Sequence, residues 1–188
     1  MENKSGRKSM TIIIIVMFAS LIIASLWDKW AWIKNSIHTV LDPTAGFLLD
    51  WNMTIGMLII VLILNVLITL VQKYTTDQKE LKRIKAEQKD LQKQIKEARL
   101  KGDTAKMSEL TKKNMSYMPQ QFKLSMGSIA YTAVPLILFY RWFDDYFKII
   151  VTNTGEPVRF FGFMGWFIFY LVFSIIFSSI FKKVMDVA

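Results

Sequence analysis

The sequence has no cysteine and a single histidine, His38, among its 188 residues. The lack of thiols excludes a disulfide scaffold, a thiolate zinc site and a cysteine nucleophile, and one imidazole cannot form a histidine metal cluster. There is also no Gly-rich phosphate-binding loop, and the pair Asp144 and Asp145 has no adjacent base. We therefore expect no catalytic residue, no metal and no cofactor, and we expect the two aspartates to be solvated on an external loop.

Charged residues are absent from four long apolar stretches, although the chain as a whole carries 21% Asp, Glu, Lys and Arg. The stretches are Met10–Leu26, Met53–Val71, Leu124–Tyr140 and Gly162–Phe181. Each is close to the roughly 20 residues with which a helix crosses about 30 Å of hydrocarbon. The sequence thus predicts an all-α integral membrane protein with four transmembrane helices.

The positive charge is concentrated in one segment. Between Lys73 and Lys123 there are fourteen Lys or Arg against seven Asp or Glu, which accounts for +7 of the net charge of +9. Basic segments are retained on the cytosolic side of membranes. We expect this segment and both termini to be cytosolic in a multi-pass protein of the plasma membrane, and the first stretch to be an uncleaved signal anchor because no small-x-small cleavage pattern follows it.

The basic segment has a helical periodicity of its own. Apolar and neutral residues alternate spacings of three and four at Leu81, Ile84, Gln88, Leu91, Ile95 and Ala98, and again at Met107, Leu110, Asn114 and Tyr117. Between the two arms, Gly102 suits a helix end and Asp103 suits the cap of the next helix. The pattern predicts an antiparallel coiled-coil hairpin, which is either a partner-binding element or only a solvated spacer.

Basic residues of the first arm are the candidates for partner binding by this hairpin. They are Lys82, Arg83, Lys85, Lys89, Lys93, Lys96 and Arg99. Lys and Arg neutralise RNA phosphates, which favours a ribosome as partner. A cytosolic targeting ATPase is the alternative.

Polar residues within the predicted spans gather toward their cytosolic halves. They are Asn65 and Thr69 on the second span, Ser125, Ser128 and Thr132 on the third, and Ser174 and Ser178 on the fourth. Because polar groups in hydrocarbon are costly unless they face protein or water, this depth pattern favours a hydrophilic groove open to the cytosol. The alternative is that these side chains bond their own helices or hold neighbouring helices together.

Methionines cluster between the hairpin tip and the third span, at Met107, Met115, Met118 and Met126. Flexible thioethers pack against varied apolar partners, so this cluster suits the capture of hydrophobic client segments. The alternative is that Met107 and Met115 only fill the hairpin seam.

Three stretches resemble the archaeal, YidC-like branch of the YidC/Oxa/Get/EMC insertase superfamily, a family long carried as a domain of unknown function. They are Gln72–Gln78, Gly102–Leu110 and Phe161–Trp166, within a similarity that runs from Trp51 to Lys183. The resemblance implies a three-helix core with a cytosolic coiled coil, a groove open to cytosol and lipid, and membrane insertion of client proteins. Bacterial relatives place an arginine in the groove, whereas no basic residue lies deep in the predicted spans here.

The chain is accordingly divided into six segments, each named for its expected role. These are a signal-anchor span with an external loop (1–50), a first core span (51–72), the basic hairpin (73–123), a second core span (124–143), an external loop (144–161) and a last core span with a cytosolic tail (162–188). The expected function is that of an insertase or chaperone for nascent or tail-anchored membrane proteins in the lipid bilayer, alone or with a membrane partner subunit. A transporter or channel subunit and a structural scaffold are the alternatives.

Overall fold

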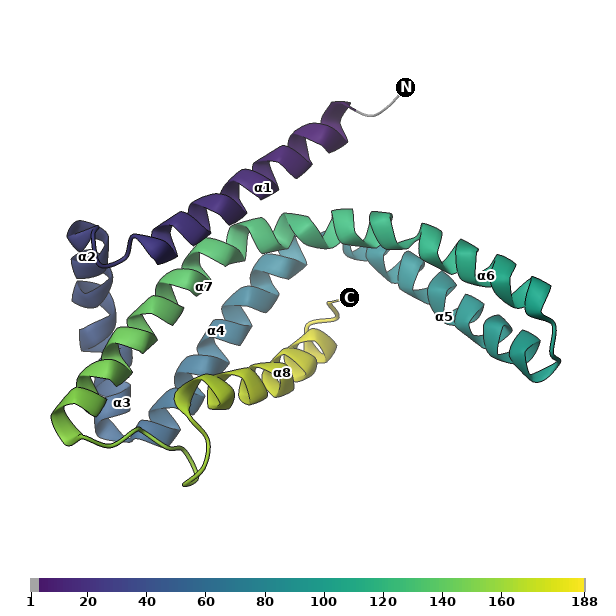
Figure 1. Cartoon of the computed structure of the whole chain (residues 1–188). Coiled ribbons are helices and arrows are strands. Elements are labelled where there is room, and N and C mark those ends of the chain that lie inside the picture. The colour runs from purple at the N-terminus through teal and green to yellow at the C-terminus, as the bar shows by residue number, and fades with distance from the viewer. Residues whose placement is uncertain (1–3, 188) are drawn as a thin grey trace.

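The computed structural model describes residues 4–187, and this part of the chain is helical, with no strand beyond an isolated bridge between Phe160 and Met164. Figure 1 shows spans gathered in a bundle and a helical arm that projects from one end of it. The elements are α1 (Lys4–Ser25), α2 (Ala31–Leu41), a π-helical turn η1 (Asp42–Gly46), α3 (Phe47–Trp51), α4 (Met53–Thr75), α5 (Gln78–Leu100), α6 (Thr104–Ser116), α7 (Met118–Thr154) and α8 (Trp166–Val184).

Two of the described helices, α4 and α8, are long and apolar enough to cross a membrane. A third span results if two bent helical segments are counted together as a single span. That pair consists of Thr104–Ile129 and Tyr131–Thr154, which meet at 54°. The apolar part of α1 found among the described residues, Ile14–Ser25, is shorter than a span. The architecture is therefore all-helical with two to three candidate spans.

The helices on either side of the expected second external loop begin and end at other residues than the sequence predicted. Helix α7 does not end near residue 143 but continues to Thr154, where Gly155 adopts φ +73°. The last span begins at Trp166 rather than Gly162, since Gly162 adopts φ +81° in the preceding turn. Tertiary burial of the aromatic residues that follow Tyr140 explains the longer α7, because a helix presents them on one face.

The expected first external loop is also helical. Instead of a turn at residues 42–46, the π-helical turn η1 joins α2 to α3, and the backbone N–H of Asp42 donates to the His38 carbonyl. Pro43 lies in the first turn of η1, directly after the end of α2. Helix α3 packs so closely on α4 that a Cβ at Gly56 would lie 2.1 Å from the Leu48 carbonyl oxygen.

The hydrophobic core lies where α3, α4, α7 and α8 meet, at the end of the bundle away from the arm. Its fully buried residues include Met57 and Val61 of α4 and a set of aromatic rings. The rings of Phe147 and Trp166 stack with centroids 5.6 Å apart. Large apolar side chains elsewhere on α4 and α8 point outward, as expected for surfaces that meet lipid.

The arm consists of α5 and α6, which lie side by side (Figure 1). Leu81, Ile84, Leu91 and Ala98 are buried within or at the base of the arm. Gly102 adopts φ +69° in the turn, and the Asp103 carboxylate caps α6 by accepting from the Lys106 backbone N–H at 3.0 Å. The helical arms and the turn chemistry therefore agree with the periodicity of the sequence.

Candidate functional site

Polar side chains of α4 are buried against α8. Asn65 is 4% exposed, and its Nδ2 atom donates to the Val61 carbonyl at 2.8 Å and to Ser174 Oγ at 3.2 Å. Thr69, which is 1% exposed, donates from Oγ1 to the Asn65 carbonyl at 2.7 Å. The structure thus brings Asn65 and Ser174 together as a polar link between two candidate spans.

Helix α7 carries a polar stripe of its own. Ser128 is buried and donates to the Ser125 carbonyl at 2.8 Å, and half-buried Thr132 donates to the Ser128 carbonyl at 3.0 Å. Ser178, also half-buried, lies one turn beyond Ser174 on α8. Of the seven predicted groove residues, Ser125 and Ser128 line a cavity, and Asn65 and Ser174 contact each other.

This cavity, of about 180 Å³, lies at the arm end of the bundle, and we call it the polar cavity. It is formed where the C-terminal ends of α4 and α8 meet the N-terminal parts of α5 and α7. Its lining residues are Gln72, Thr76, Gln78, Leu81, Lys85, Gln121, Ser125, Ser128, Ile129, Lys182 and Val187. Polar groups from four helices therefore converge at one point.

The sequence analysis missed Gln72, Thr76 and Gln121 of this cavity, although a signal was present. Gln72 and Thr76 continue the spacing begun by Asn65 and Thr69 along α4. Gln121 begins the same stripe on α7 that continues through Ser125. Both stripes have spacings of four, three and four residues, which place their members on one helical face.

Charge in the polar cavity is positive. The Lys85 pKa is lowered below its ordinary value, first by burial and then by the positive charge of Lys182. Beside them, Lys82 Nζ lies 2.5 Å from Asp186 Oδ2, which ties the segment after α8 to the arm. Val187 follows and is buried at the cavity.

An apolar cleft of about 280 Å³ lies farther along the same two helices, at the end away from the arm. It is lined by Leu136, Ile137, Phe139, Tyr140 and Phe143 of α7 and by Trp166 and Tyr170 of α8. Helices α7 and α8 therefore line a polar cavity at one end and an apolar cleft at the other.

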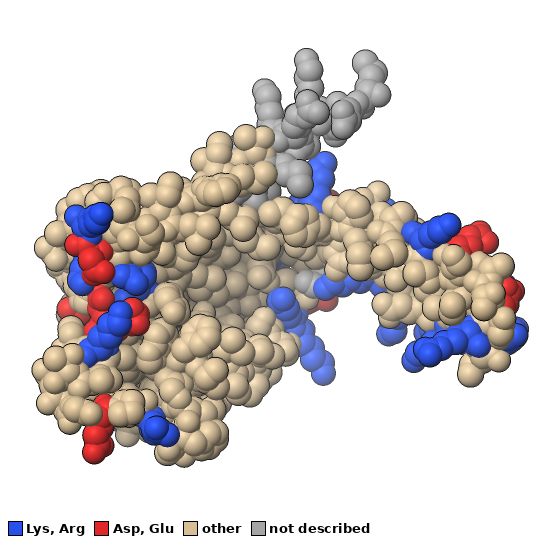
Figure 2. Space-filling model, in the orientation of Figure 1, with Lys and Arg blue, Asp and Glu red and all other residues tan. Residues whose placement is uncertain are grey.

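The basic residues of the arm have different surroundings. Arg83 pairs with Glu80 at 2.6 Å and Glu87 at 2.7 Å, and the Glu80 hydrogen bond and charge raise its pKa above the ordinary value. Lys85, Lys89, Lys93, Lys96 and Arg99 are exposed, whereas Lys82 is half-buried and bound to Asp186. Figure 2 shows Lys and Arg along the arm and at its base, beside wide uncharged surfaces over the spans.

The four methionines predicted to capture clients differ in burial. Met115 and Met118 are 57% and 56% exposed near the base of the arm. Met107 is half-buried between the arms, and Met126 is 7% exposed at the start of α7. Met118 and Pro119 fit the first turn of α7, where proline is tolerated.

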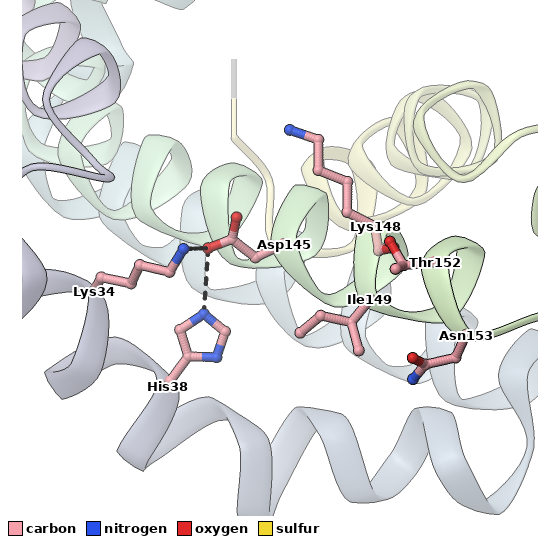
Figure 3. Close-up of a pocket in the computed structure, with 7 residues that line it drawn as sticks. All are labelled: Lys34, His38, Asp145, Lys148, Ile149, Thr152 and Asn153. Carbon is pink, nitrogen blue, oxygen red and sulfur yellow. Dashed lines mark hydrogen bonds and ion pairs between the residues drawn. The ribbon is translucent and has the colours of Figure 1, made fainter.

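The expectation that Asp144 and Asp145 are solvated on a loop is wrong. Both lie on α7, and the Asp145 side chain is only 11% exposed. Its Oδ2 accepts from Trp27 Nε1 at 2.6 Å. The same atom lies 3.0 Å from Lys34 Nζ and 3.4 Å from His38 Nε2 (Figure 3). These contacts fix α2 and the segment before it to α7, a long-range role that sequence spacing does not reveal.

No group of three or more His, Cys, Asp or Glu side chains suited to a metal ion occurs among the residues that the structure describes. The carboxylate of Asp145 is already neutralised by Lys34. The arrangement can solvate polar groups at one end of α7 and α8 and apolar groups at the other.

Comparison with known proteins identifies the family. The family model for integral membrane proteins described as EMC3/TMCO1-like matches residues 38–161, about two thirds of the chain. The chain belongs to the EMC3/TMCO1-like family of integral membrane proteins. This family is part of the insertase-related superfamily. No curated protein and no solved structure matches the chain.

The family match covers part of the site. It includes the α4 and α7 polar stripes and the whole arm, whereas α1 and α8 lie outside it. The EMC3/TMCO1-like assignment agrees with the broader superfamily expected from the sequence.

Proposed function

We propose that this family member is an insertase that guides hydrophobic segments of client proteins into the bilayer between α7 and α8. The observation that carries the proposal is the succession, along these two helices, of the polar cavity and the apolar cleft. Membership of the EMC3/TMCO1-like family supports it independently. In this proposal the polar cavity opens to the cytosol.

The physical advantage lies in desolvation. A short hydrophilic tail that crosses hydrocarbon loses its hydrogen bonds to water, at a cost of several kcal/mol for each polar group. Glutamine and serine side chains around the polar cavity replace part of that hydration. The attached apolar segment then slides along the apolar cleft into lipid, and the step needs no nucleotide.

The arm serves in this proposal as the docking element for the machinery that delivers clients. Its exposed lysines favour a ribosome, and a cytosolic targeting ATPase is the second candidate. Helix α1 is proposed as a fourth, retained span, which leaves both termini cytosolic in the plasma membrane. We also propose that the chain is of the archaeal, YidC-like type within the superfamily.

Site-specific photocrosslinking tests the client path. A photoreactive residue is placed at Thr132 or Ser178, and the protein is incubated with a ribosome-bound nascent chain that carries one transmembrane segment. Probes at Asn65 are avoided because this side chain is buried and bonded to Ser174. We expect crosslinks from both probed positions, since they continue the polar faces of α7 and α8.

Matched controls lie on the same helices. Tyr131 of α7 and Ile176 of α8 are 67% and 45% exposed, and each neighbours a probed position on a different face. Crosslinks from Thr132 and Ser178 but not from these controls support a defined client path. Equal crosslinks from all four positions, or none with folded protein, would favour a scaffold instead.

A further inference from the structure

Two lysines line the polar cavity at the arm end of the bundle. Lys85 of α5 and Lys182 of α8 both line the polar cavity, and the positive charge of Lys182 contributes to the lowered pKa of Lys85. Among the described residues, neither forms an ion pair. The nearby carboxylate of Asp186 is bound to Lys82. Two positive charges that line one cavity repel each other, and an anion seated between them would offset this repulsion.

The other lining groups suit a phosphate. Gln72 and Gln121 contribute side-chain amides from α4 and α7, and amide N–H groups donate to phosphate oxygens. Leu81, Ile129 and Val187 supply an apolar wall on the same cavity. A volume of about 180 Å³ accommodates a phosphate with part of a glycerol backbone.

The position of the cavity identifies the source of the phosphate. It lies where α4 and α8, both long and apolar enough to span a membrane, end beside the arm. This is the depth of lipid headgroups, and basic pockets between spans bind anionic headgroups. Figure 2 shows basic side chains at the base of the arm, next to the uncharged surface of the spans.

We infer that the polar cavity binds the phosphate of an anionic phospholipid between Lys85 and Lys182. The lipid bridges the arm to the last span and anchors the base of the arm at the membrane surface. This inference does not depend on insertase activity, because lipid binding is measured on the purified protein without a client.

The test uses the full chain, purified in detergent, and native mass spectrometry with phosphatidylglycerol. The variant K85Q/K182Q removes both charges from the cavity. The matched control, K89Q/K183Q, removes two charges from exposed positions next along the same helices, outside the cavity lining. We expect the cavity variant to bind phosphatidylglycerol about thirty-fold more weakly and the control to bind within about three-fold of the native chain, since a lysine near a lipid surface contributes about 1 kcal/mol.

Further arms of the experiment separate the sources of phosphate. Inorganic phosphate and glycerol 3-phosphate are added as competitors at equal concentration, and phosphatidylcholine replaces phosphatidylglycerol in a parallel series. The inference predicts weak competition and weak phosphatidylcholine binding. Equal loss in both variants, full competition by inorganic phosphate alone, or equal binding of phosphatidylcholine would each overturn it.

Folding is controlled with a conservative variant. K85R/K182R keeps both charges and is expected to retain lipid binding, while circular dichroism reports the helix content of every variant. Loss of binding in the arginine variant with native helix content would also contradict a charge-based site.

Discussion

At the scale of single residues, the most informative side chain is Asn65. Its amide lies 4% exposed between α4 and α8 and donates to Ser174. In hydrocarbon an unpaired amide is costly, so the serine opposite makes this residue tolerable within the span. The same contact explains why a buried polar residue on α4 does not have to face a client directly.

The Asn65 and Ser174 contact predicts measurable energetic coupling. In a double-mutant cycle, N65A and S174A should couple by about 0.6 kcal/mol, the typical value for a hydrogen bond between membrane helices. Steric trapping of unfolding in bicelles measures the free energies. The cycle of N65A with S178A, one turn away, should be additive, and equal coupling in both cycles would argue against a specific contact.

At the other end of the bundle, Asp145 is the side chain that joins distant elements. Its replacement by Asn removes the charge that binds Lys34 and should lower the free energy of unfolding by about 1–3 kcal/mol, because the contact is mostly buried. D144N is the control, since Asp144 is more exposed and its Lys148 partner is 66% exposed. Chemical denaturation in detergent checks this difference, and equal effects would refute the anchoring role of Asp145.

At the scale of elements, the arm combines a buried apolar seam with a polar defect. Leu81, Ile84 and Leu91 are each no more than 5% exposed, whereas the Asn114 Oδ1 atom is buried without a hydrogen-bond partner. A buried unsatisfied acceptor weakens packing. An arm that opens easily suits an element that must adjust to a large partner.

Replacement of Asn114 by Leu should therefore stabilise the arm by about 1 kcal/mol. Hydrogen exchange of the α6 amides is expected to slow accordingly. Thr111→Leu, at an exposed position one turn earlier, should stay within about 0.5 kcal/mol. Faster exchange in the Asn114 variant would show that the amide has a partner in solution.

The contact between the end of the chain and the arm predicts a pH dependence. The hydrogen bond from Lys82, and then its charge, hold the pKa of the Asp186 carboxyl below its usual value. Because this pKa is lower in the folded state, the contact is fully stabilising at pH values above the ordinary Asp pKa of about 3.9. The stabilisation is lost as the pH falls through the lower pKa of the folded state. The contact should thus be intact at pH 5 and lost only in more acidic solution.

Spin labels measure this contact cleanly, because the chain has no native cysteine. Labels at the exposed positions Ala86 and Val184 should report a single short distance at pH 5 that broadens toward pH 3. In the D186N variant the distance distribution should not change with pH. A transition centred above pH 5 would contradict the assignment to Asp186.

At the scale of the whole molecule, periodicity predicted what depends on local sequence. The helical arms, the turn at Gly102 and the two long apolar helices follow from spacing, capping and hydropathy. The same patterns did not predict the helical segments α2, η1 and α3 or the extension of α7 to Thr154. They depend on burial of aromatic residues such as Trp142 and Phe147 between distant elements, which one sequence does not display.

The candidate site was likewise predicted in part from the sequence and in part not. The polar stripes of α4 and α7 are visible in the sequence, and their members at the helix ends were missed because they lie beyond the apolar runs. The convergence of Lys85 and Lys182 depends on how the arm meets α8, and the role of Asp145 depends on the docking of α1 and α2. These relations require the three-dimensional arrangement.

The central claim is that α7 and α8 guide client segments into the bilayer, and reconstituted insertion tests it most directly. A single-span client is synthesised in the presence of protein-free vesicles, vesicles with the native chain, or vesicles with S125V/T132V, and protease protection measures insertion. S179V is the control, because Ser179 is an exposed serine of α8 outside the cavity lining. The account predicts insertion above the protein-free level with the native chain and S179V, and several-fold less with S125V/T132V; insertion no higher than in protein-free vesicles would contradict it.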